Sequence, residues 1–314
     1  MNIIPNISFI IPCYNSGEYL EACVASILDQ KGDFYIKEII IVDDASTDEL
    51  TISCLPKLLH LDLIKLVANK GKKGAAGARN TGLKLANSEW VVFLDADDVL
   101  TDNSIQKRIE TLLQYPDCGW LGGDFTLWNE DGSLERDSFF KSRSKTADTL
   151  KLAFIESRSV YYPKPVAEFI YVCLTAIGVS MIKKDLIIAL GGFREHLRQA
   201  EDYQFWIRLA AISDFVFIPQ SLMLYRQHGT NTTAQDIPPR YWTIQAFEEL
   251  RKDTDFGQFM RLIDDRLAGF NIENAFYYRS KKNKRAAFQS YYAAFKLRPK
   301  LEVLRSMLAT VLTG

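Results

Sequence analysis

Histidine and cysteine are sparse in this sequence. Its 314 residues include three histidines, His60, His196 and His228, and five cysteines that never form a CxxC pair. Scattered cysteines in odd number provide neither a disulfide framework nor the ligand spacing of a zinc site. We therefore expect free thiols and a reducing, cytoplasmic setting.

The sequence also lacks a strong net charge and a long apolar run. Its formal net charge of −1 gives no global positive field for binding nucleic acid. The apolar window from Phe169 to Ile182 has 14 uncharged residues, whereas a bilayer-spanning helix needs about 20. The first residues, MNIIPNISFIIP, lack the basic region of a secretory signal. We expect no nucleic-acid partner, no transmembrane helix and no export signal.

Two common nucleotide-binding fingerprints are missing as well. The glycine-rich segment NKGKKGAAGARNTG, residues 69–82, spaces its glycines as GxxGxxG, which matches neither GxGxxG nor GxxxxGK[ST]. The segment instead predicts a flexible loop that leads into a helix. Arg79 would reach a base or phosphate from there, because a guanidinium donates two parallel hydrogen bonds to phosphate. A surface arginine without a ligand is the alternative.

Hydrophobic periodicity predicts alternating strands and helices in the first third of the chain. Short β-branched or apolar runs predict buried strands at 7–12, 38–44, 63–67 and 90–95, and helical patterns cover 17–30, 47–59, 74–87 and 103–115. This order is typical of an α/β protein with a mainly parallel sheet. Ligands of such sheets bind at the carboxyl ends of the strands.

Polar residues follow these strands where the ligand would lie. Tyr14 and Asn15 follow the first strand, Asp43 and Asp44 the second, and the run Asp95 to Asp98 the fourth. Two of these patterns have a simpler explanation, because DDASTD at 43–48 contains good helix caps and DADD at 95–98 resembles a solvated turn.

The density of carboxylates favours a metal site over a solvated turn. Asp95 and Asp97 stand two residues apart, and neighbouring carboxylates repel each other unless a cation or donor joins them. Mg²⁺ and Mn²⁺ prefer oxygen ligands, and Mg²⁺ often combines one or two carboxylates with substrate phosphates. The pattern therefore predicts a divalent cation that bridges protein carboxylate and a diphosphate.

Four strings together resemble family 2 of the inverting glycosyltransferases, over about residues 6–232. They are IPCYNSGEYLEACVASILDQ, IIIVDDASTDE, GARNTGLKLANSEWVVFLDADD and AEDYQFWIRLA. The resemblance implies the nucleotide-diphospho-sugar transferase (GT-A) fold, with a mixed, mainly parallel sheet flanked by helices. It also implies a nucleotide-diphospho-sugar donor.

The resemblance assigns donor-binding roles to residues of the first two strands. Pro12, Tyr14 and Asn15 fall in the first-strand motif, where the aromatic ring packs on the nucleotide base. Asp44 resembles the carboxylate that accepts a hydrogen bond from a base imide, which suits uracil better than adenine. For Tyr14, a core tyrosine with a satisfied hydroxyl is the alternative.

The resemblance also assigns the metal and the catalytic base. Asp97 matches the direct metal ligand, and Asp95 would contact the ribose or a metal-bound water. His228, in LYRQHGTNTT, resembles a residue of a closing loop that touches metal or phosphate. Asp202 matches the general base that deprotonates the acceptor hydroxyl. From the residues alone, Asp202 and its neighbour Glu201 could equally be helix-dipole partners at a first turn.

The remaining sequence predicts an acceptor region and a helical appendage. We assign 1–100 to the nucleotide-sugar-binding half, 101–235 to the acceptor-binding and catalytic half of the same domain, and 236–314 to a helical C-terminal region. Within 101–235, the segment 127–172 would form part of the acceptor wall. In the C-terminal region, Phe288, Tyr292 and Phe295 stand at helical spacing, and Pro299 ends that helix.

The C-terminal region is also strongly basic. Residues 279–305 contain nine lysines and arginines against Glu302 alone. This charge run is either a solvated face or, with the apolar residues Leu301, Leu304, Leu308 and Leu312, a contact with the anionic inner membrane face through 279–312.

The sequence therefore predicts a metal-dependent inverting glycosyltransferase. It would use Mn²⁺ or Mg²⁺ to move a sugar from a nucleotide diphosphate, UDP in our expectation, to a carbohydrate or lipid-linked acceptor in polysaccharide or glycolipid synthesis. A sugar nucleotidyltransferase and a catalytically silent nucleotide- or carbohydrate-binding module are the alternatives.

Overall fold

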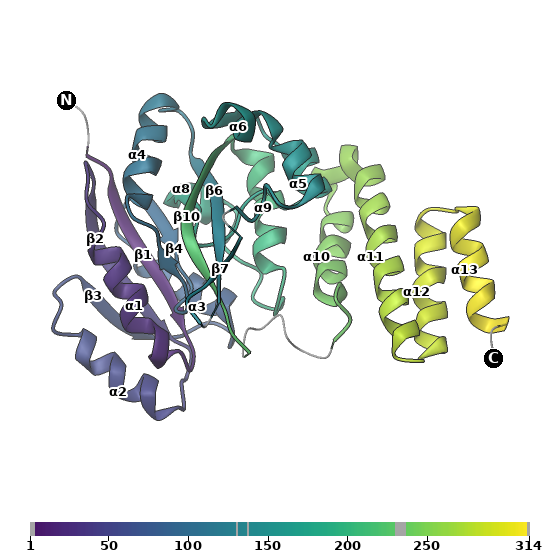
Figure 1. Cartoon of the computed structure of the whole chain (residues 1–314), viewed down its shortest axis with the longest axis horizontal. Coiled ribbons are helices and arrows are strands. Elements are labelled where there is room, and N and C mark those ends of the chain that lie inside the picture. The colour runs from purple at the N-terminus through teal and green to yellow at the C-terminus, as the bar shows by residue number, and fades with distance from the viewer. Residues whose placement is uncertain (1–3, 130, 137, 230–236, 313–314) are drawn as a thin grey trace. The chain divides into compact units, whose positions relative to one another are not determined.

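A computed structural model of the chain describes residues 4–129, 131–136, 138–229 and 237–312. The chain divides into two compact units, one of Met1–Arg198 with Phe205–Asn231 and one of Gln199–Gln204 with Thr232–Gly314. The first unit carries a mixed sheet and the second is helical (Figure 1). The functional division into 1–100, 101–235 and 236–314 stays a prediction.

The first unit alternates strands and helices from β1 to β4, as the periodicity predicts for the first third of the chain. Its strands are β1 (Asn6–Cys13), β2 (Tyr35–Asp43), β3 (Ile64–Ala68), β4 (Trp90–Phe93), β5 (Val99–Leu100), β6 (Trp120–Asn129), β7 (Leu134–Arg136), β8 (Val160–Tyr162), β9 (Met181–Lys183) and β10 (Phe215–Gln227). Its helices are α1 (Gly17–Leu28), α2 (Glu49–Leu58), α3 (Ala75–Leu85), α4 (Ser104–Gln114), α5 (Ser144–Thr149), α6 (Lys151–Glu156), α7 (Val166–Tyr171) and α8 (Lys184–Ala189). The helix α9 (Glu201–Ile212) begins in the second unit and continues in the first.

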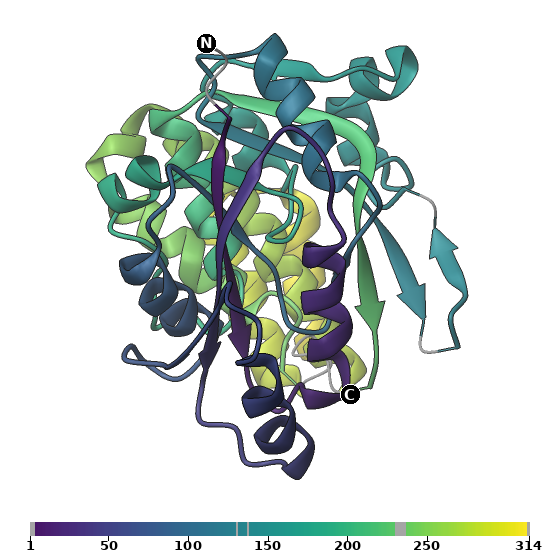
Figure 2. The ribbon, with the colours of Figure 1, turned by 90° about the vertical axis from the view of Figure 1, so that its left-hand side faces the viewer.

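The strands form one sheet in the order β3-β2-β1-β4-β9-β6-β10-β5, with β7 beside β6 and β8 beside β10. The pairs β1–β2, β1–β4, β2–β3 and β6–β10 are parallel, whereas β9 is antiparallel to both β4 and β6. The turned view shows the long green β10 beside the teal β6 (Figure 2). The predicted mixed, mainly parallel sheet is confirmed.

Helices cover the sheet, so that the apolar residues of the first strands are buried. Ile7, Phe9, Ile10 and Ile11 of β1 are fully buried, as expected for a strand that packs on both faces. The helix α3 lies so close to β1 that a Cβ atom on Gly82 would come within 2.4 Å of the Ile10 side chain. Glycine at this position lets the helix that follows the glycine-rich loop pack directly on the strand.

Aromatic side chains fill the core on the other part of this unit. Trp120 stacks on Trp206 with ring centroids 5.3 Å apart, and Phe169 and Phe215 pack on the Trp120 ring. Phe205, Trp206 and Leu209, which the sequence places on one apolar face of a helix, are fully buried. These contacts fix β6, α9 and β10 against one another.

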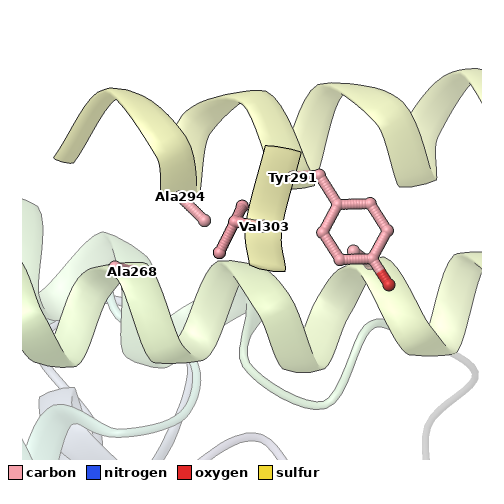
Figure 3. Packing of buried hydrophobic residues seen from close by; sticks show 5 residues of the cluster. Ala268, Tyr291, Ala294 and Val303 are labelled. Atoms are coloured by element: carbon pink, nitrogen blue, oxygen red, sulfur yellow. The ribbon is translucent and has the colours of Figure 1, made fainter. Parts of the chain in front are cut away.

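The second unit consists of helices packed side by side. They are α10 (Tyr241–Lys252), the 3₁₀ helix η2 (Thr254–Phe259), α11 (Met260–Ser280), α12 (Lys284–Leu297) and α13 (Leu301–Leu312). The core between the last three is formed by Ala268, Ala275, Tyr291, Ala294 and Val303 (Figure 3).

The buried residues of α12 each stand one position before the aromatic residues Phe288, Tyr292 and Phe295. Ala287, Tyr291 and Ala294 are buried, whereas Tyr292 is half exposed. Small alanines let α11 and α12 approach closely, and the half-buried Phe295 packs against the edge of the same core. No helix among the described residues combines the length and apolar character needed to cross a bilayer.

Candidate active site

Parallel pairing brings the ends of the first strands to one edge of the sheet. Cys13 at the end of β1 pairs with Asp43 at the end of β2, which pairs with Ala68 at the end of β3. On the other side of β1, Ile10 pairs with Phe93 at the end of β4. The polar residues that follow these strands therefore lie along this edge, as predicted from the β-α-β order.

Asn15 ties the first strand end to the loop after β2. Its side-chain Oδ1 accepts a hydrogen bond from the Thr47 backbone N–H at 2.8 Å, and its own N–H donates to Ser46 Oγ at 3.1 Å. Asn15 adopts φ of +50°, a left-handed conformation that asparagine tolerates better than most residues. The structure thus gives Asn15 a loop-holding role, and the predicted donor contact stays a prediction.

Tyr14 presents its ring at this edge. The side chain is 44% exposed, and the ammonium of Lys73 lies 4.1 Å from the ring centroid. The alternative of a buried core tyrosine is therefore wrong. Pro12, two residues earlier, is half-buried and pairs with Val42 in the β1–β2 ladder. Tyr14 is thus a partly exposed ring with a cation over one of its faces.

Asp44 holds the glycine-rich loop against the sheet. Its Oδ1 accepts from the Asn69 amide at 2.6 Å, and its Oδ2 accepts from the Gly74 backbone N–H at 2.7 Å. Gly74 has φ of +128°, a conformation that favours glycine. These contacts were not predicted from the sequence, because they join residues about 30 positions apart. Each carboxylate oxygen keeps a second lone pair for a ligand.

Arg79 binds protein carboxylate in this structure. Its Nη2 lies 2.6 Å from Asp95 Oδ1, and its guanidinium lies 5.6 Å from the Phe193 ring centroid. The Arg79 side chain is 4% exposed and that of Asp95 is 35% exposed. The surface-arginine alternative is wrong, because Arg79 is buried and orients Asp95. A direct contact of Arg79 with base or phosphate stays a prediction.

Asp97 and His228 come together from positions 131 residues apart in the sequence. His228 Nε2 lies 2.9 Å from Asp97 Oδ2, and the His228 ring lies 5.0 Å from the Tyr19 ring centroid. Burial and the neighbouring Asp95 carboxylate raise the pKa of Asp97, although the His228 contact opposes this. A raised pKa in a carboxylate cluster marks a place where added positive charge would be stabilising.

Asp98 supports the turn from inside. It is buried and accepts a hydrogen bond from the Arg226 backbone N–H at 3.0 Å. Burial, followed by the charges of Asp97 and Asp95, raises the pKa of Asp98 well above its usual range. The same carboxylates, with burial as the larger cause, raise the pKa of the Cys23 thiol beneath them. The turn therefore concentrates negative charge in a poorly solvated place.

Arg226 is a residue that the sequence analysis missed. Its Nε donates to the Asp97 carbonyl oxygen at 3.0 Å, while its guanidinium lies 3.9 Å from the Trp128 ring centroid and 4.8 Å from that of Tyr19. It thereby fixes the backbone of the acidic turn. Its place two residues before His228, in the string YRQH, was the available signal.

The described residues do not form a complete metal cage. No group of three or more His, Cys, Asp or Glu side chains among them is arranged to hold an ion. The predicted set of Asp95, Asp97 and His228 is thus divided, since Asp95 faces Arg79 while Asp97 faces His228. A site with one or two protein carboxylates still fits a cation whose shell is completed by substrate phosphates.

An open pocket lies beside His228. It has a volume of about 480 Å³ and is lined by Asn129, Asp131, Gln227, His228 and Gly229. The part of LYRQHGTNTT beyond Gly229 lies outside the described residues. The pocket places polar side chains next to the Asp97–His228 pair.

Asp202 belongs to the second unit, in the first turn of α9. Its Oδ1 accepts from the Tyr203 backbone N–H at 2.6 Å, a contact consistent with a helix N-terminus. Its role as a base stays a prediction, as does the acceptor wall at 127–172. Within that segment, Phe169 is fully buried in the core and Tyr161 is 42% exposed.

Comparisons with known proteins identify the family of this chain. The family model described as Glycosyl transferase family 2 matches residues 8–166. The poly(ribitol-phosphate) beta-N-acetylglucosaminyltransferase TarP of Staphylococcus aureus is 37% identical over 205 residues, 64% of this chain and 56% of that protein. The UDP-Glc:alpha-D-GlcNAc-diphosphoundecaprenol beta-1,3-glucosyltransferase WfgD of Escherichia coli is 27% identical over 203 residues, 65% of this chain and 69% of that protein.

A solved structure supports the fold. The mannosyltransferase PcManGT of Pyrobaculum calidifontis, in complex with GDP-Man and Mn²⁺, matches with a TM-score of 0.62 and 21% identity, covering 99% of this chain and 81% of that one. The GT-A fold predicted from the sequence is confirmed. The matched family segment includes Tyr14, Asp44, Arg79, Asp95 and Asp97. The chain belongs to glycosyl transferase family 2 and is a glycosyltransferase.

Proposed function

We propose that this glycosyltransferase is metal-assisted and inverting, and that it moves a sugar from a UDP-linked donor to an acceptor hydroxyl in polysaccharide or glycolipid synthesis. The observation that carries this proposal is the Asp97–His228 pair, at 2.9 Å, in which burial and the Asp95 carboxylate raise the pKa of Asp97. A cation bound there would favour the charged form of Asp97.

Asp97 would hold the Mn²⁺ or Mg²⁺ ion directly, with His228 on the side of the diphosphate. Asp95, oriented by Arg79 at 2.6 Å, would contact the ribose or a metal-bound water. The bound ion would neutralise the charge that develops on the leaving nucleoside diphosphate. A related mannosyltransferase structure contains Mn²⁺, and carboxylate oxygens suit both ions.

Tyr14 and Asp44 would recognise the donor base. The exposed ring of Tyr14 would offer a stacking surface for the base, with Pro12 two residues earlier in β1 and Asn15 fixing the adjoining loop. Asp44 would accept the base imide N–H with the lone pairs left by its two protein donors. WfgD is named for UDP-Glc and PcManGT was solved with GDP-Man, so nucleotide titration decides the base.

Asp202 would act as the general base. A carboxylate suits this step because the acceptor hydroxyl becomes acidic only as its oxygen bonds to the anomeric carbon, so that the proton moves in the transition state. One base on the face opposite the leaving group implies a single displacement with inversion, as in inverting glycosidases.

The proposed acceptor is a polymer or a lipid-linked sugar. WfgD is named for a diphosphoundecaprenol acceptor and TarP for poly(ribitol-phosphate). The proposed cytoplasmic location agrees with five cysteines that are all free, as in a reducing compartment.

Turnover and product stereochemistry test the proposal. The purified protein is incubated with UDP-Glc or UDP-GlcNAc, Mn²⁺ and candidate acceptors, while UDP release and the product anomer are measured. We expect inversion, and a fall in turnover of about 10²–10⁴-fold for Asp202→Asn with unchanged UDP–Mn²⁺ binding. The matched control is Asp185→Asn, an exposed aspartate in the first turn of α8.

Three outcomes would contradict parts of the proposal. Near-normal turnover of Asp202→Asn refutes its role as base. Pyrophosphate release from a nucleoside triphosphate and a sugar phosphate would support a nucleotidyltransferase instead. Nucleotide binding without transfer to any acceptor would support a silent binding module.

A further inference from the structure

The helical C-terminal unit exposes most of its basic residues. Of the nine lysines and arginines in 279–305, eight have exposed side chains: Arg279, Lys281, Lys282, Lys284, Arg285, Lys296, Lys300 and Arg305. The ninth, Arg298, is half-buried, forms an ion pair with Asp265 and donates to the Arg261 carbonyl oxygen at 2.6 Å. Arg298 therefore has a structural role, whereas the other eight basic side chains face solvent.

The positive charge is concentrated. The one acidic residue in 279–305, Glu302, is also exposed. Five of the eight exposed basic residues lie within 279–285, at the turn that joins α11 to α12. The like charges within such a cluster repel one another and lower the free energy of unfolding unless anionic groups lie nearby.

The helix α13 adds an exposed apolar stripe. Leu301 is 61% exposed and Leu308 is 50% exposed, and Arg305 lies between them at helical spacing. Val303, on the opposite side of the helix, is buried against Tyr291 and Ala294 (Figure 3). The apolar residues on the outer side of α13 are therefore not needed for this core. The side chain of Leu312 lies outside the described residues.

The helix α12 repeats the arrangement. Its outer side carries Arg285, Tyr292 and Lys296, where Tyr292 is 50% exposed and the Lys296 ammonium lies 5.8 Å from its ring centroid. Tyrosine and leucine between cations match the composition of surfaces that lie in the headgroup region of a bilayer, where rings and aliphatic chains enter and cations meet phosphate.

We propose that the outer sides of α12 and α13, with the 279–285 turn, form a docking surface for an anionic lipid bilayer. Charge complementarity selects this partner, because negatively charged lipids attract each nearby lysine or arginine, while Leu301 and Leu308 bury apolar area in the interface. A second copy of the chain would instead bring two basic surfaces together in a symmetric contact. The proposal is independent of the catalytic assignment.

Vesicle flotation of the full chain tests this surface. Vesicles of phosphatidylcholine alone and with added phosphatidylglycerol are compared at low and high salt. We expect binding to the anionic vesicles only, and a loss of that binding at high salt. The charge variant Arg285→Glu/Lys300→Glu/Arg305→Glu should weaken binding by about tenfold or more. The apolar variant Leu301→Ser/Leu308→Ser should weaken it without changing its salt dependence.

Matched variants in the first unit serve as controls. Lys31→Glu/Lys57→Glu/Lys151→Glu changes three exposed lysines, and Leu152→Ser/Ile155→Ser changes two exposed apolar residues. Both should bind vesicles like wild type. Nucleotide titration of every variant separates this proposal from the catalytic one, because vesicle binding needs no donor.

Three results would overturn the proposal. The first is the absence of binding to anionic vesicles at low salt, and the second is binding that the charge and apolar variants leave unchanged. The third is a dimer of the wild-type protein, measured by light scattering, that the apolar variant dissociates while vesicles bind neither form. That result would assign the surface to a second copy.

Discussion

Two acidic clusters lie at the same edge of the sheet and differ in what satisfies them. In the β2 cluster, Asp43 and Asp44 accept hydrogen bonds from Ser46, Asn69 and Gly74. In the β4 cluster, which comprises Asp95, Asp97 and Asp98, burial and mutual repulsion raise the pKa values of the last two. The first cluster is built into the fold, whereas the second keeps a charge that a ligand can satisfy.

We propose that this difference distinguishes aspartates whose main protein contacts hold loops from aspartates that would hold a metal ion. Carboxylates that accept backbone and amide N–H groups stabilise loops. Carboxylates held together without enough donors lower the stability of the unliganded protein, which is a frequent property of functional sites. The strand WVVF thus carries charge to a place where the protein alone leaves it incompletely compensated.

The largest expected effect is on turnover. Asp97→Ala should lower the rate of sugar transfer by about a thousandfold, because metal-ion stabilisation of a leaving group is worth several kcal/mol. Steady-state UDP release at saturating Mn²⁺ measures it. Asp43→Ala, in the β2 cluster, is the control and should retain more activity. Transfer by Asp97→Ala within tenfold of wild type would remove the catalytic distinction between the clusters.

The next effect is on stability, where the same substitution should have opposite results. Asp44→Asn places an amide donor against Gly74 N–H or the Asn69 amide, and should lower the free energy of unfolding by about 1–3 kcal/mol. Asp98→Asn keeps an acceptor for the Arg226 N–H and removes a buried charge, so this free energy should stay equal or rise. Urea unfolding without metal checks both. Equal destabilisation would contradict the comparison.

A smaller effect concerns the residue that links the β4 cluster to the C-terminal end of β10. Arg226→Lys keeps the charge but loses the planar group between Trp128 and Tyr19 and the bond to the Asp97 carbonyl. We expect the affinity for UDP with Mn²⁺ to fall by about tenfold, since a loss of about 1.4 kcal/mol corresponds to that factor. Arg208→Lys is the control variant, because the Arg208 guanidinium donates to the carbonyl oxygens of Leu190 and Gly192. It should affect stability more than affinity.

The smallest effect is on the pH dependence of stability. A carboxyl whose pKa is raised by folding contributes stability that is present below its unfolded pKa and is lost as the pH rises through the folded value. Asp97 and Asp98 behave in this way. For Glu38, burial by itself raises the pKa, but hydrogen bonds from Lys65, Ser8 and Asn87 outweigh it, so that the pKa is lowered overall. Its contribution is present above the unfolded pKa and is lost as the pH falls through the folded value.

The difference between wild type and Asp98→Asn isolates the first of these two trends. Without metal, the free energy of unfolding of wild type should rise relative to that of Asp98→Asn as the pH falls from 7 towards 5. Chemical unfolding at several pH values measures this difference. A constant difference, or one of opposite sign, would show that the charge of Asp98 is compensated within the protein.

Local patterns were sufficient to predict the first four strands and the edge at which the candidate residues gather, but not most of the strands in the later part of the sheet. Apolar runs such as FII and VVF report burial directly, and the parallel order follows from the helices between them. The meeting of Asp97 with His228 was predicted through the family resemblance. Neither pattern indicated that Arg79 binds Asp95 or that Asp44 holds the Gly74 loop, because these contacts depend on side-chain geometry across separate elements.

In the helical unit, too, the sequence predicts the elements but not which side chains pack together. The sequence located the basic charge of 279–305, and the spacing of Phe288, Tyr292 and Phe295 indicated a helix but not which of its sides is buried. Burial follows the close approach of Ala287, Tyr291 and Ala294 to neighbouring helices. Hydropathy alone does not distinguish two adjacent stripes when both are apolar.

The most direct test of the central claim is calorimetric titration of the protein with UDP, with and without Mn²⁺, for wild type and Asp97→Ala. We predict that wild type binds UDP tightly only with Mn²⁺ and that Asp97→Ala loses this metal-dependent binding while keeping its fold. Equal affinity of the two proteins for UDP in the presence of Mn²⁺ would contradict the account, because the β4 cluster would then not hold the metal.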